Sequence, residues 1–225
     1  LKDKREIQIY DPTSGSGSLL IHIGKAVARH VGSGDGIKYY AQELKENTYN
    51  LTRMNLIMRG ILPDNIVARN GDTLEEDWPY FDENDPVGTY NPLYVDAVVS
   101  NPPYYVDSLL SPDEGRNTAR HAAGLPFGEL AAAVVRLLSP GGRFALVLPP
   151  VEMQRFRSAA LGRLYPVRWT EVCSTPRRGV RRILAEFCTT PVPAPEPARL
   201  IIELGGPDSY TEDYRRLTGD FYLKF

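Results

Sequence analysis

The chain has 225 residues, of which 42% are hydrophobic and 24% charged, so its composition is that of a globular protein long enough for one large domain with its own core. No stretch approaches the ~20 apolar residues of a membrane-spanning helix, and the charged start has no apolar segment behind it, so we expect a cytoplasmic protein without a membrane contact. Cys173 and Cys188 have neither CxxC spacing nor a histidine cluster, so we expect two free thiols in strands and no metal site.

The formal net charge of −2 is unevenly distributed along the chain. Residues 1–104 hold 10 Lys and Arg against 15 Asp and Glu, whereas residues 105–225 hold 16 against 13. The second half has clustered arginines, namely Arg155, Arg157, Arg163, Arg168, Arg177, Arg178, Arg181 and Arg182. Such a patch is expected of a protein that contacts a phosphate backbone, but a solvated surface explains it equally well, so the sequence leaves both interpretations open.

The first predicted elements are a strand, a glycine loop and a helix. An alternating run over residues 5–10 leads into residues 11–18, Asp-Pro-Thr-Ser-Gly-Ser-Gly-Ser, after which apolar residues recur at helical spacing from Leu19. Gly15 and Gly17 allow a tight turn and a close approach to a ligand, and the helix start offers free N–H groups to an anion. The loop is neither a complete GxGxxG nor a P-loop, so a cofactor site and a plain tight turn both remain open.

Two further strands are predicted to end in carboxylates. A strand over 37–43 ends at Glu43, at a suitable distance from the glycine loop to accept hydrogen bonds from a ribose, although Glu43 could equally cap the next helix. That helix spans 47–58, with Tyr49, Leu51, Met54, Leu56 and Ile57 as its apolar positions. A third strand over 66–72 ends at Asp72, from which a carboxylate can accept a hydrogen bond from an exocyclic amine.

The central predicted strand, residues 95–100, is followed by Asn101, Pro102, Pro103 and Tyr104. Neither proline can donate to a sheet, so the strand stops there and presents an amide and an aromatic ring at a sheet edge where ligands bind in open α/β folds. The polar segment after Tyr105 is too long for a simple connector, so Arg116, Arg120 and His121 are candidates for contacts with a substrate phosphate or base. A short solvated helix is the alternative.

The remaining elements complete an α/β pattern. We predict helices over 130–138 and 152–164, a buried strand over 143–149, a terminal hairpin of 167–172 with 182–187, and an optional edge strand over 200–204. The alternation of strands and helices predicts a single Rossmann-like domain over residues 1–225, with a mostly parallel, seven-stranded sheet and an antiparallel terminal hairpin.

In order and spacing, the glycine loop, Glu43, Asp72 and Asn101 to Tyr104 together resemble the class I S-adenosylmethionine-dependent methyltransferases, in particular the adenine-N6 branch. The resemblance implies that S-adenosylmethionine binds with its methionyl carboxylate near Gly15 and Gly17, its ribose on Glu43 and its adenine amine near Asp72. The cofactor-binding residues that it implies are Asp11, Thr13, Gly15, Gly17, Glu43 and Asp72.

The resemblance is divided near Tyr104. Residues 1–104, the donor-binding half, look like the modification subunit of type I restriction-modification systems, which methylates adenine in DNA. Residues 103–225, with 105–225 as the substrate-side half, look like the adenine-N6 methyltransferases of valine tRNA. We therefore expect a chimera, and because both families have a segment ahead of the first strand, we expect that segment to be missing before Leu1.

The chemistry that the resemblance implies centres on Asn101, Pro102, Pro103 and Tyr104. The Asn101 oxygen and the Pro102 carbonyl would accept hydrogen bonds from the adenine amine, and Tyr104 would stack on the base, a contact of roughly 1–3 kcal/mol. The favoured substrate is adenine in tRNA. The alternatives are adenine in DNA, and a chimeric fold that binds the donor weakly or is inert.

Overall fold

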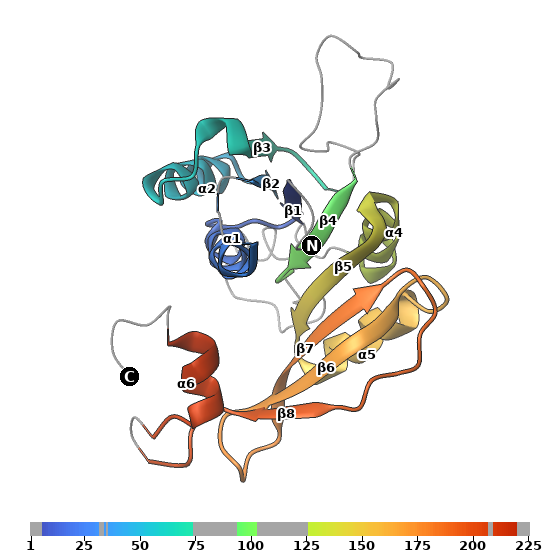
Figure 1. Cartoon of the computed structure of the whole chain (residues 1–225). Helices are drawn as coiled ribbons and strands as arrows, with labels where there is room; N and C mark the ends of the chain where they lie inside the picture. Colours follow the sequence, from blue (N-terminus) through green and yellow to red (C-terminus); the bar gives the residue numbers. More distant parts are fainter. Residues whose placement is uncertain are drawn as a thin grey trace, which may run out of the picture.

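The computed structural model describes residues 6–31, 34, 36–73, 94–102, 126–206 and 209–219. Its centre is an eight-stranded sheet with the order β3-β2-β1-β4-β5-β7-β6-β8 (Figure 1). The strands are β1 (Ile7–Asp11), β2 (Ile37–Glu43), β3 (Ile66–Asn70), β4 (Val95–Ser100), β5 (Leu138–Leu148), β6 (Tyr165–Cys173), β7 (Val180–Cys188) and β8 (Ala198–Ile201). The first five are mutually parallel, and β7 runs antiparallel to both β5 and β6. The expected α/β fold is confirmed.

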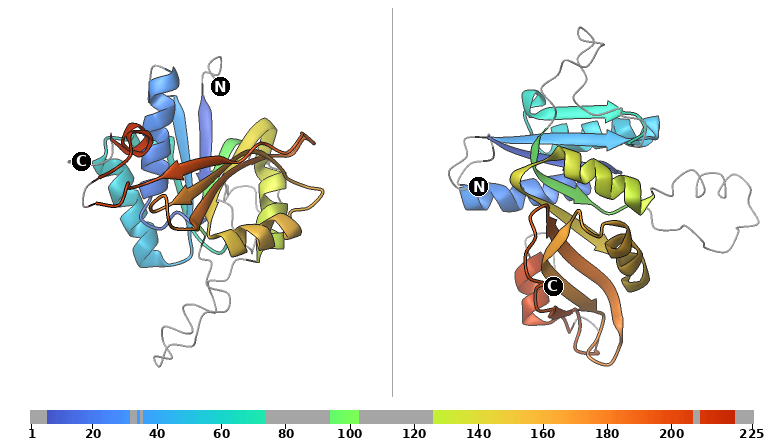
Figure 2. Two further views of the ribbon diagram at one scale, coloured as in Figure 1. Left: turned by 90° about the horizontal axis from the view of Figure 1, so that it is seen from below. Right: turned by 90° about the vertical axis from the view of Figure 1, so that its right-hand side faces the viewer.

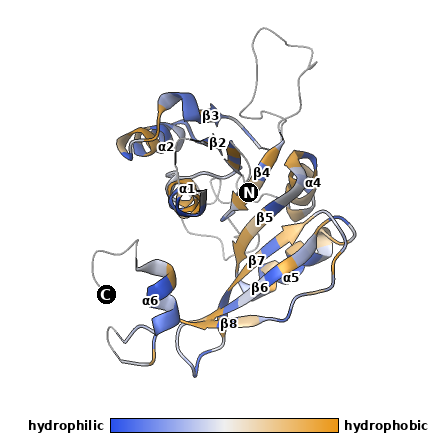
Figure 3. Ribbon diagram, viewed as in Figure 1, coloured by the Kyte–Doolittle hydropathy of each residue, from blue (hydrophilic) through white to orange (hydrophobic). Residues whose placement is uncertain are grey.

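Helices cover the two faces of this sheet (Figures 1 and 2). The helices are α1 (Ser18–Val31), α2 (Glu46–Met58), α4 (Phe127–Leu137), α5 (Pro150–Ala159) and α6 (Glu212–Thr218), with a short 3-10 turn, η1, at Pro63–Asn65. Neighbouring residues on β1 face opposite ways, since Ile9 packs in the core cluster under α1 and α2, and Tyr10 in the cluster under α4 and α5. Figure 3 shows hydrophobic and hydrophilic residues together along α1, as expected for a helix with one face on a sheet.

Several sequence expectations need correction. The sheet has eight strands, not seven, because β8 pairs in parallel with β6 after a proline-rich connector. The third strand ends at Asn70, so Asp72 lies two residues beyond it. Helix α5 ends at Ala159, well before Leu164.

Helix α2 has a different buried face from the one its apolar residues suggest. Thr52 and Leu56 are its buried residues, whereas Leu51, Met54 and Ile57 are exposed by 43%, 57% and 53%. The buried face of α2 therefore includes the polar side chain of Thr52, which contacts the glycine loop.

Two other expectations concern the whole chain. Cys173 and Cys188 are buried free thiols in β6 and β7, as expected. Among the described residues, no helix is long and apolar enough to span a membrane.

Candidate active site

The glycine loop leaves the carboxyl end of β1 and is shaped by Asp11. The Asp11 side chain is 1% exposed, and its Oδ1 accepts hydrogen bonds from the Thr13 backbone N–H at 3.0 Å and from the Thr13 hydroxyl at 3.4 Å. Gly15 and Gly17 have φ values of +55° and +75°, which side chains rarely tolerate. A Cβ at Gly17 would also lie 3.2 Å from Thr52 Cγ2, so glycine permits the close approach of the loop to α2.

Two side chains of α2 hold the carbonyl groups of this loop. The Thr52 hydroxyl lies 2.5 Å from the Gly15 carbonyl oxygen and 3.1 Å from that of Thr48, and because it has a single proton, the shorter contact is its main hydrogen bond. The Asn55 side-chain amide donates to the Ser16 carbonyl at 2.8 Å. Both loop carbonyls therefore face α2.

This arrangement decides which loop amide can meet a ligand. The Gly15 N–H donates to Glu43 and the Gly17 N–H donates to the Ser14 carbonyl. In a trans peptide the N–H points opposite to the preceding C=O, so the Ser16 N–H points away from α2. It donates to no other residue in the part of the chain that the structure describes. Of the three amides, that of Ser16, next to the start of α1, is thus the one left available to a ligand, whereas those of Gly15 and Gly17 already have acceptors.

Glu43, at the carboxyl end of β2, lies directly beside the loop. Its Oε2 accepts from the Gly15 N–H at 3.0 Å and its Oε1 from the Lys45 N–H at 3.1 Å. A carboxylate has about four lone-pair positions, so each oxygen keeps one for a further donor. Glu43 therefore does not cap α2, whose N-cap residue is Lys45 and has no side-chain cap hydrogen bond. It holds the Lys45 N–H just before the helix and can still accept from a hydroxyl.

The segment after β3 closes the same edge. The Thr73 hydroxyl donates to the Pro12 carbonyl at 2.7 Å, and the Asn70 side chain donates to the Glu43 and Leu44 carbonyls at 2.8 and 2.9 Å. Asp72 is half-buried between these two contacts. The carboxylates predicted at the ends of the second and third strands therefore lie at one edge with the loop.

The carboxyl end of β4 is tied to the loop by a hydrogen bond between hydroxyl groups. Thr13 Oγ1 lies 3.1 Å from Ser100 Oγ, and Ser100 is 1% exposed. The next residue, Asn101, is exposed, and Pro102 is buried. Of the other predicted site residues, Pro103, Tyr104, Arg116, Arg120 and His121 lie outside the described residues.

Burial changes the acid–base properties of two side chains at this edge. It raises the pKa of Asp11 from 3.8 to about 7, an effect that the Thr13 hydrogen bonds reduce and the nearby Glu43 charge increases. Burial also raises the pKa of Tyr10, whose hydroxyl donates to the Gln42 side chain at 2.7 Å. The Asp11 carboxyl is thus partly protonated near neutral pH, which lets it lie in the core beside Glu43.

The sequence did not predict the residues whose hydrogen bonds hold the elements of the site together. Thr52, Asn55, Thr73, Gln42 and Ser100 make its cross-connections. Ser100, Gln42 and Thr73 are the sequence neighbours of Asn101, Glu43 and Asp72, whereas Thr52 and Asn55 lie on α2 and carried no such signal. No group of three metal-ligating side chains occurs among the described residues.

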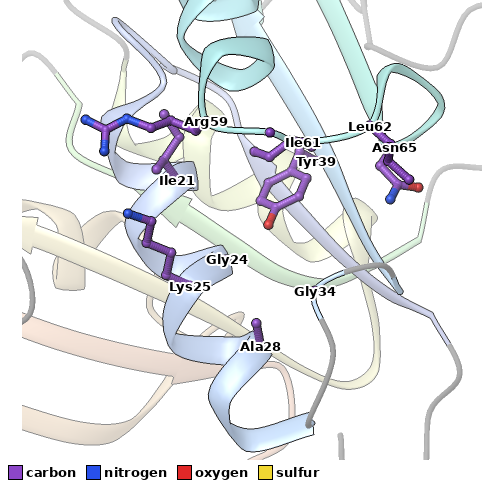
Figure 4. A pocket seen from close by; sticks show the side chains of 11 residues that line it. Ile21, Gly24, Lys25, Ala28, Gly34, Tyr39, Arg59, Ile61, Leu62 and Asn65 are labelled. Atoms are coloured by element: carbon purple, nitrogen blue, oxygen red, sulfur yellow. The ribbon is translucent and has the colours of Figure 1, made fainter.

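Two of the hollows lie beside α1. A cavity of about 190 Å³ lies between α1, β2 and the turn after α2, where the Tyr39 ring crosses Gly24 (Figure 4). A Cβ at Gly24 would lie 2.1 Å from the Tyr39 hydroxyl. A larger groove of about 380 Å³ runs over β4, β5 and β7 beside α1, and its lining includes Leu19, Val99 and Leu184.

A family model described as N-6 DNA Methylase matches residues 1–160. The chain belongs to the N-6 DNA Methylase family. The match covers every element of the candidate active site, from the glycine loop to Asn101. It also runs without a break across residues 103 and 104, and the chimeric origin stays a prediction.

Curated relatives of this N-6 DNA Methylase family member are named tRNA1(Val) (adenine(37)-N6)-methyltransferase. The protein of that name from Bacteroides fragilis strain ATCC 25285 is 40% identical over 135 residues, which are 60% of this chain and 56% of the relative. One from Pseudoalteromonas translucida is 34% identical over 150 residues, which are 65% of this chain and 64% of the relative. The chain thus matches a little over half the length of these relatives.

Solved structures show the same fold. The type I restriction-modification methyltransferase subunit from Streptococcus thermophilus superposes with a TM-score of 0.64 at 24% identity, covering 97% of this chain and 48% of that one. TrmN from Thermus thermophilus superposes with a TM-score of 0.52 at 17% identity, covering 84% of this chain and 45% of that one. The fold is therefore the class I methyltransferase fold.

Proposed function

We propose that this chain transfers the methyl group of S-adenosylmethionine to the N6 amine of adenine in tRNA. The observation that carries the proposal is the Thr13–Ser100 hydrogen bond, because it joins the loop that would hold the donor to the strand that ends at Asn101. The family and the names of the curated relatives support adenine-N6 chemistry. The expected cytoplasmic location and the organisation of residues 1–225 as one domain are parts of this proposal.

The loop and its neighbours suit the donor. The Ser16 N–H and the start of α1 present partial positive charge to the methionyl carboxylate. The free lone pairs of Glu43 can accept from the two ribose hydroxyls, and Asp72 lies at the same edge for the adenine amine. Asp11 and Thr13 would support donor binding indirectly, because the hydrogen bonds between them fix the path of the loop.

Asn101 and Pro102 would prepare the target amine. The N6 lone pair is delocalised into the adenine ring, so hydrogen bonds accepted by the Asn101 side-chain oxygen and the Pro102 carbonyl return electron density to the nitrogen. When bound, the donor supplies a sulfonium methyl group, whose carbon–sulfur bond breaks as the nitrogen–carbon bond forms, and the amine proton then passes to water. Tyr104 would stack on the extruded base, as the family resemblance implies, and Pro103, which has no N–H to donate, belongs to the same predicted motif.

DNA is the second candidate substrate, and a specific observation favours it. The matching family is described as N-6 DNA Methylase, and the Streptococcus thermophilus structure is a restriction-modification subunit. We favour tRNA because the relatives with 34–40% identity carry the tRNA name. An inert chimeric fold is the third outcome that an experiment must separate.

The test is a transfer assay with labelled S-adenosylmethionine and, in parallel, unmodified tRNA, duplex DNA or no nucleic acid. We expect label in tRNA, and we expect Asn101→Ala to lower the rate about 10²- to 10³-fold, as is typical when one preorganised hydrogen-bonding group is removed from a transition state. Asn50→Ala, on the exposed side of α2, is the matched control and should leave the rate unchanged. Label in DNA alone would reject the tRNA proposal, and donor binding without transfer would reject the enzyme.

A further inference from the structure

We propose that the turn between β6 and β7, together with the start of β7, is a surface that contacts the phosphate backbone of the nucleic-acid substrate. We call residues 174–182 the arginine hairpin. They contain Arg177, Arg178, Arg181 and Arg182 and no acidic residue. The inference rests on the proposed function only in that the substrate is a nucleic acid.

The sheet register places the arginine hairpin at the same edge as the candidate active site. In β4 and β5, Ser100 lies opposite Leu146, so Asn101 emerges where β5 ends. In the antiparallel pair of β5 and β7, Leu148 lies opposite Ile183, so the residues that precede Ile183 extend beyond the carboxyl end of β5. The β6–β7 turn therefore projects past the edge from which Asn101 emerges (Figure 1).

The separation suits a nucleic-acid strand. Neighbouring strands lie about 4.8 Å apart, and each residue advances about 3.3 Å along a strand. Strands β7 and β6 are the second and third strands from β4, and the arginines lie a few residues beyond the carboxyl end of β5, so their distance from Asn101 is about 15–25 Å. With a rise of about 3.4 Å per nucleotide in a duplex strand, this distance corresponds to about four to seven nucleotides. The hairpin would thus hold the backbone a short way from the target base.

The arginines of the hairpin differ from others nearby in their partners. Arg143 and Arg168 both pair with Glu186, at 3.2 and 3.7 Å, so each has a carboxylate partner and the single charge of Glu186 offsets one of the two. Arg177, Arg178 and Arg181 are exposed, and none of them forms an ion pair with a residue of the described ranges. These three guanidinium groups, on the turn and at the start of β7, have no ion-pair partner among the described residues, so they attract phosphate oxygens, which they can bind through two parallel hydrogen bonds.

The hairpin is also ordered enough to present these groups. The Arg178 backbone N–H donates to the Thr175 carbonyl at 3.1 Å, which closes the turn, and Pro176 restricts the chain between them. On β7, Arg181 and Arg182 point to opposite faces of the strand, so the positive charge surrounds the tip. A substrate strand that crosses this edge meets the charge from either side.

The experiment compares charge reversals at the two ends of the β6 strand. Arg177→Glu/Arg178→Glu changes the arginine hairpin, and Arg163→Glu changes an exposed arginine in the turn before β6, at the opposite edge of the sheet. Binding of unmodified tRNA is measured by fluorescence anisotropy over a range of salt concentrations, and S-adenosylmethionine binding by calorimetry. Urea unfolding of every variant checks that the fold is retained.

We expect the double reversal to weaken tRNA binding at least tenfold more than Arg163→Glu, and to lower the slope of log affinity against log salt by about 0.7–0.9 for each lost phosphate contact. Donor affinity should be unchanged. Arg177→Lys/Arg178→Lys keeps the charge and should keep most of the affinity, which separates charge from local folding. Equal affinities and slopes for the double reversal and Arg163→Glu would overturn the inference, as would a loss seen with duplex DNA alone.

The failure of this inference is distinguishable from that of the proposed function. Methyl transfer by the unchanged protein with no effect of the hairpin substitutions rejects the surface alone. Binding that depends on the hairpin without any transfer supports the surface and rejects the enzyme.

Discussion

The two sides of the sheet centre are held together by different forces. On the side of α4 and α5, Phe127, Phe144, Phe156 and Phe187 form a phenylalanine cluster whose ring centroids lie 5.3–6.1 Å apart. On the side of α2, hydrogen bonds among Asp11, Thr13, Glu43, Thr52 and Asn55, with the loop backbone, form what we call the loop network. Apolar packing is strong but imposes little direction, whereas hydrogen bonds fix the orientation of individual peptide groups.

This difference suggests a division of labour. The phenylalanine cluster supplies stability to the strands that carry the arginine hairpin, and the loop network supplies the geometry with which the donor would be bound. Substitutions in the two regions should therefore separate unfolding free energy from ligand affinity. Phe156→Ala and Thr52→Val test that separation, and Asp11→Asn tests the buried carboxyl of the loop network; they follow in order of decreasing expected effect on stability.

Phe156→Ala should have the largest effect on stability. Phe156 is fully buried and contacts the other three rings of the cluster, so its loss leaves a cavity that costs about 3–5 kcal/mol of unfolding free energy. Urea denaturation measures this change. Val151→Ala, at a 64% exposed position of the same helix, should change it by no more than about 0.5 kcal/mol. If Phe156→Ala, while still folded, lost donor affinity, the division of labour would be wrong.

Asp11→Asn should change the pH dependence of stability. Between the ordinary pKa of 3.8 and the folded pKa of about 7, the Asp11 carboxyl binds more protons in the folded protein than in the unfolded chain. The contribution of Asp11 to the free energy of unfolding therefore falls as pH rises across that interval. Asparagine keeps an acceptor for the Thr13 N–H and removes the titration. The variant should therefore gain stability relative to the unchanged protein, on the order of a few kcal/mol from about pH 4 to above pH 7.

Urea denaturation at four pH values between 4.5 and 7.5 measures that difference. Parallel stability curves for the two proteins would show that Asp11 does not titrate in this range. A free energy of unfolding of Asp11→Asn that falls, relative to that of the unchanged protein, as pH rises would contradict the raised pKa itself.

Thr52→Val should have the smallest effect on stability and a specific effect on the loop. Valine keeps the shape but leaves the Gly15 carbonyl without its donor, which costs about 1–3 kcal/mol. Because the Ser16 N–H then loses its fixed direction, the Kd for S-adenosylmethionine should rise about tenfold, as measured by calorimetry. Thr52→Ser keeps the hydroxyl and should restore the affinity, and an unchanged Kd in Thr52→Val would remove the loop network from donor binding.

The sequence predicted those features that depend on a single element. The run of β-branched residues before Asn101 and the apolar spacing after the glycine loop identify a strand and a helix locally, and parallel strands bring their carboxyl ends to one edge. Glu43 was thus correctly expected beside the loop, although its role toward a ribose stays a prediction.

The features that could not be predicted from the sequence depend on contacts between two secondary-structure elements. Thr52 and Asn55 occur within a helix whose apolar residues suggest a different buried face, and only the packing of α2 against the loop reveals their contacts. Likewise, β8 has four residues and follows a run of prolines, so its pairing with β6 depends on where that connector returns. Tyr104, Arg116, Arg120 and His121 lie outside the described ranges, so their roles stay predictions.

The crossing of Tyr39 over Gly24 has a consequence for how sequences of this family can vary. Because any side chain at position 24 would overlap the Tyr39 ring, a larger residue there requires a smaller one on β2. We therefore expect these two positions, which are 15 residues apart in the sequence, to vary together among related proteins. A glycine in the middle of a helix weakens that helix on its own, but Gly24 leaves the space that the large Tyr39 ring on the neighbouring strand occupies.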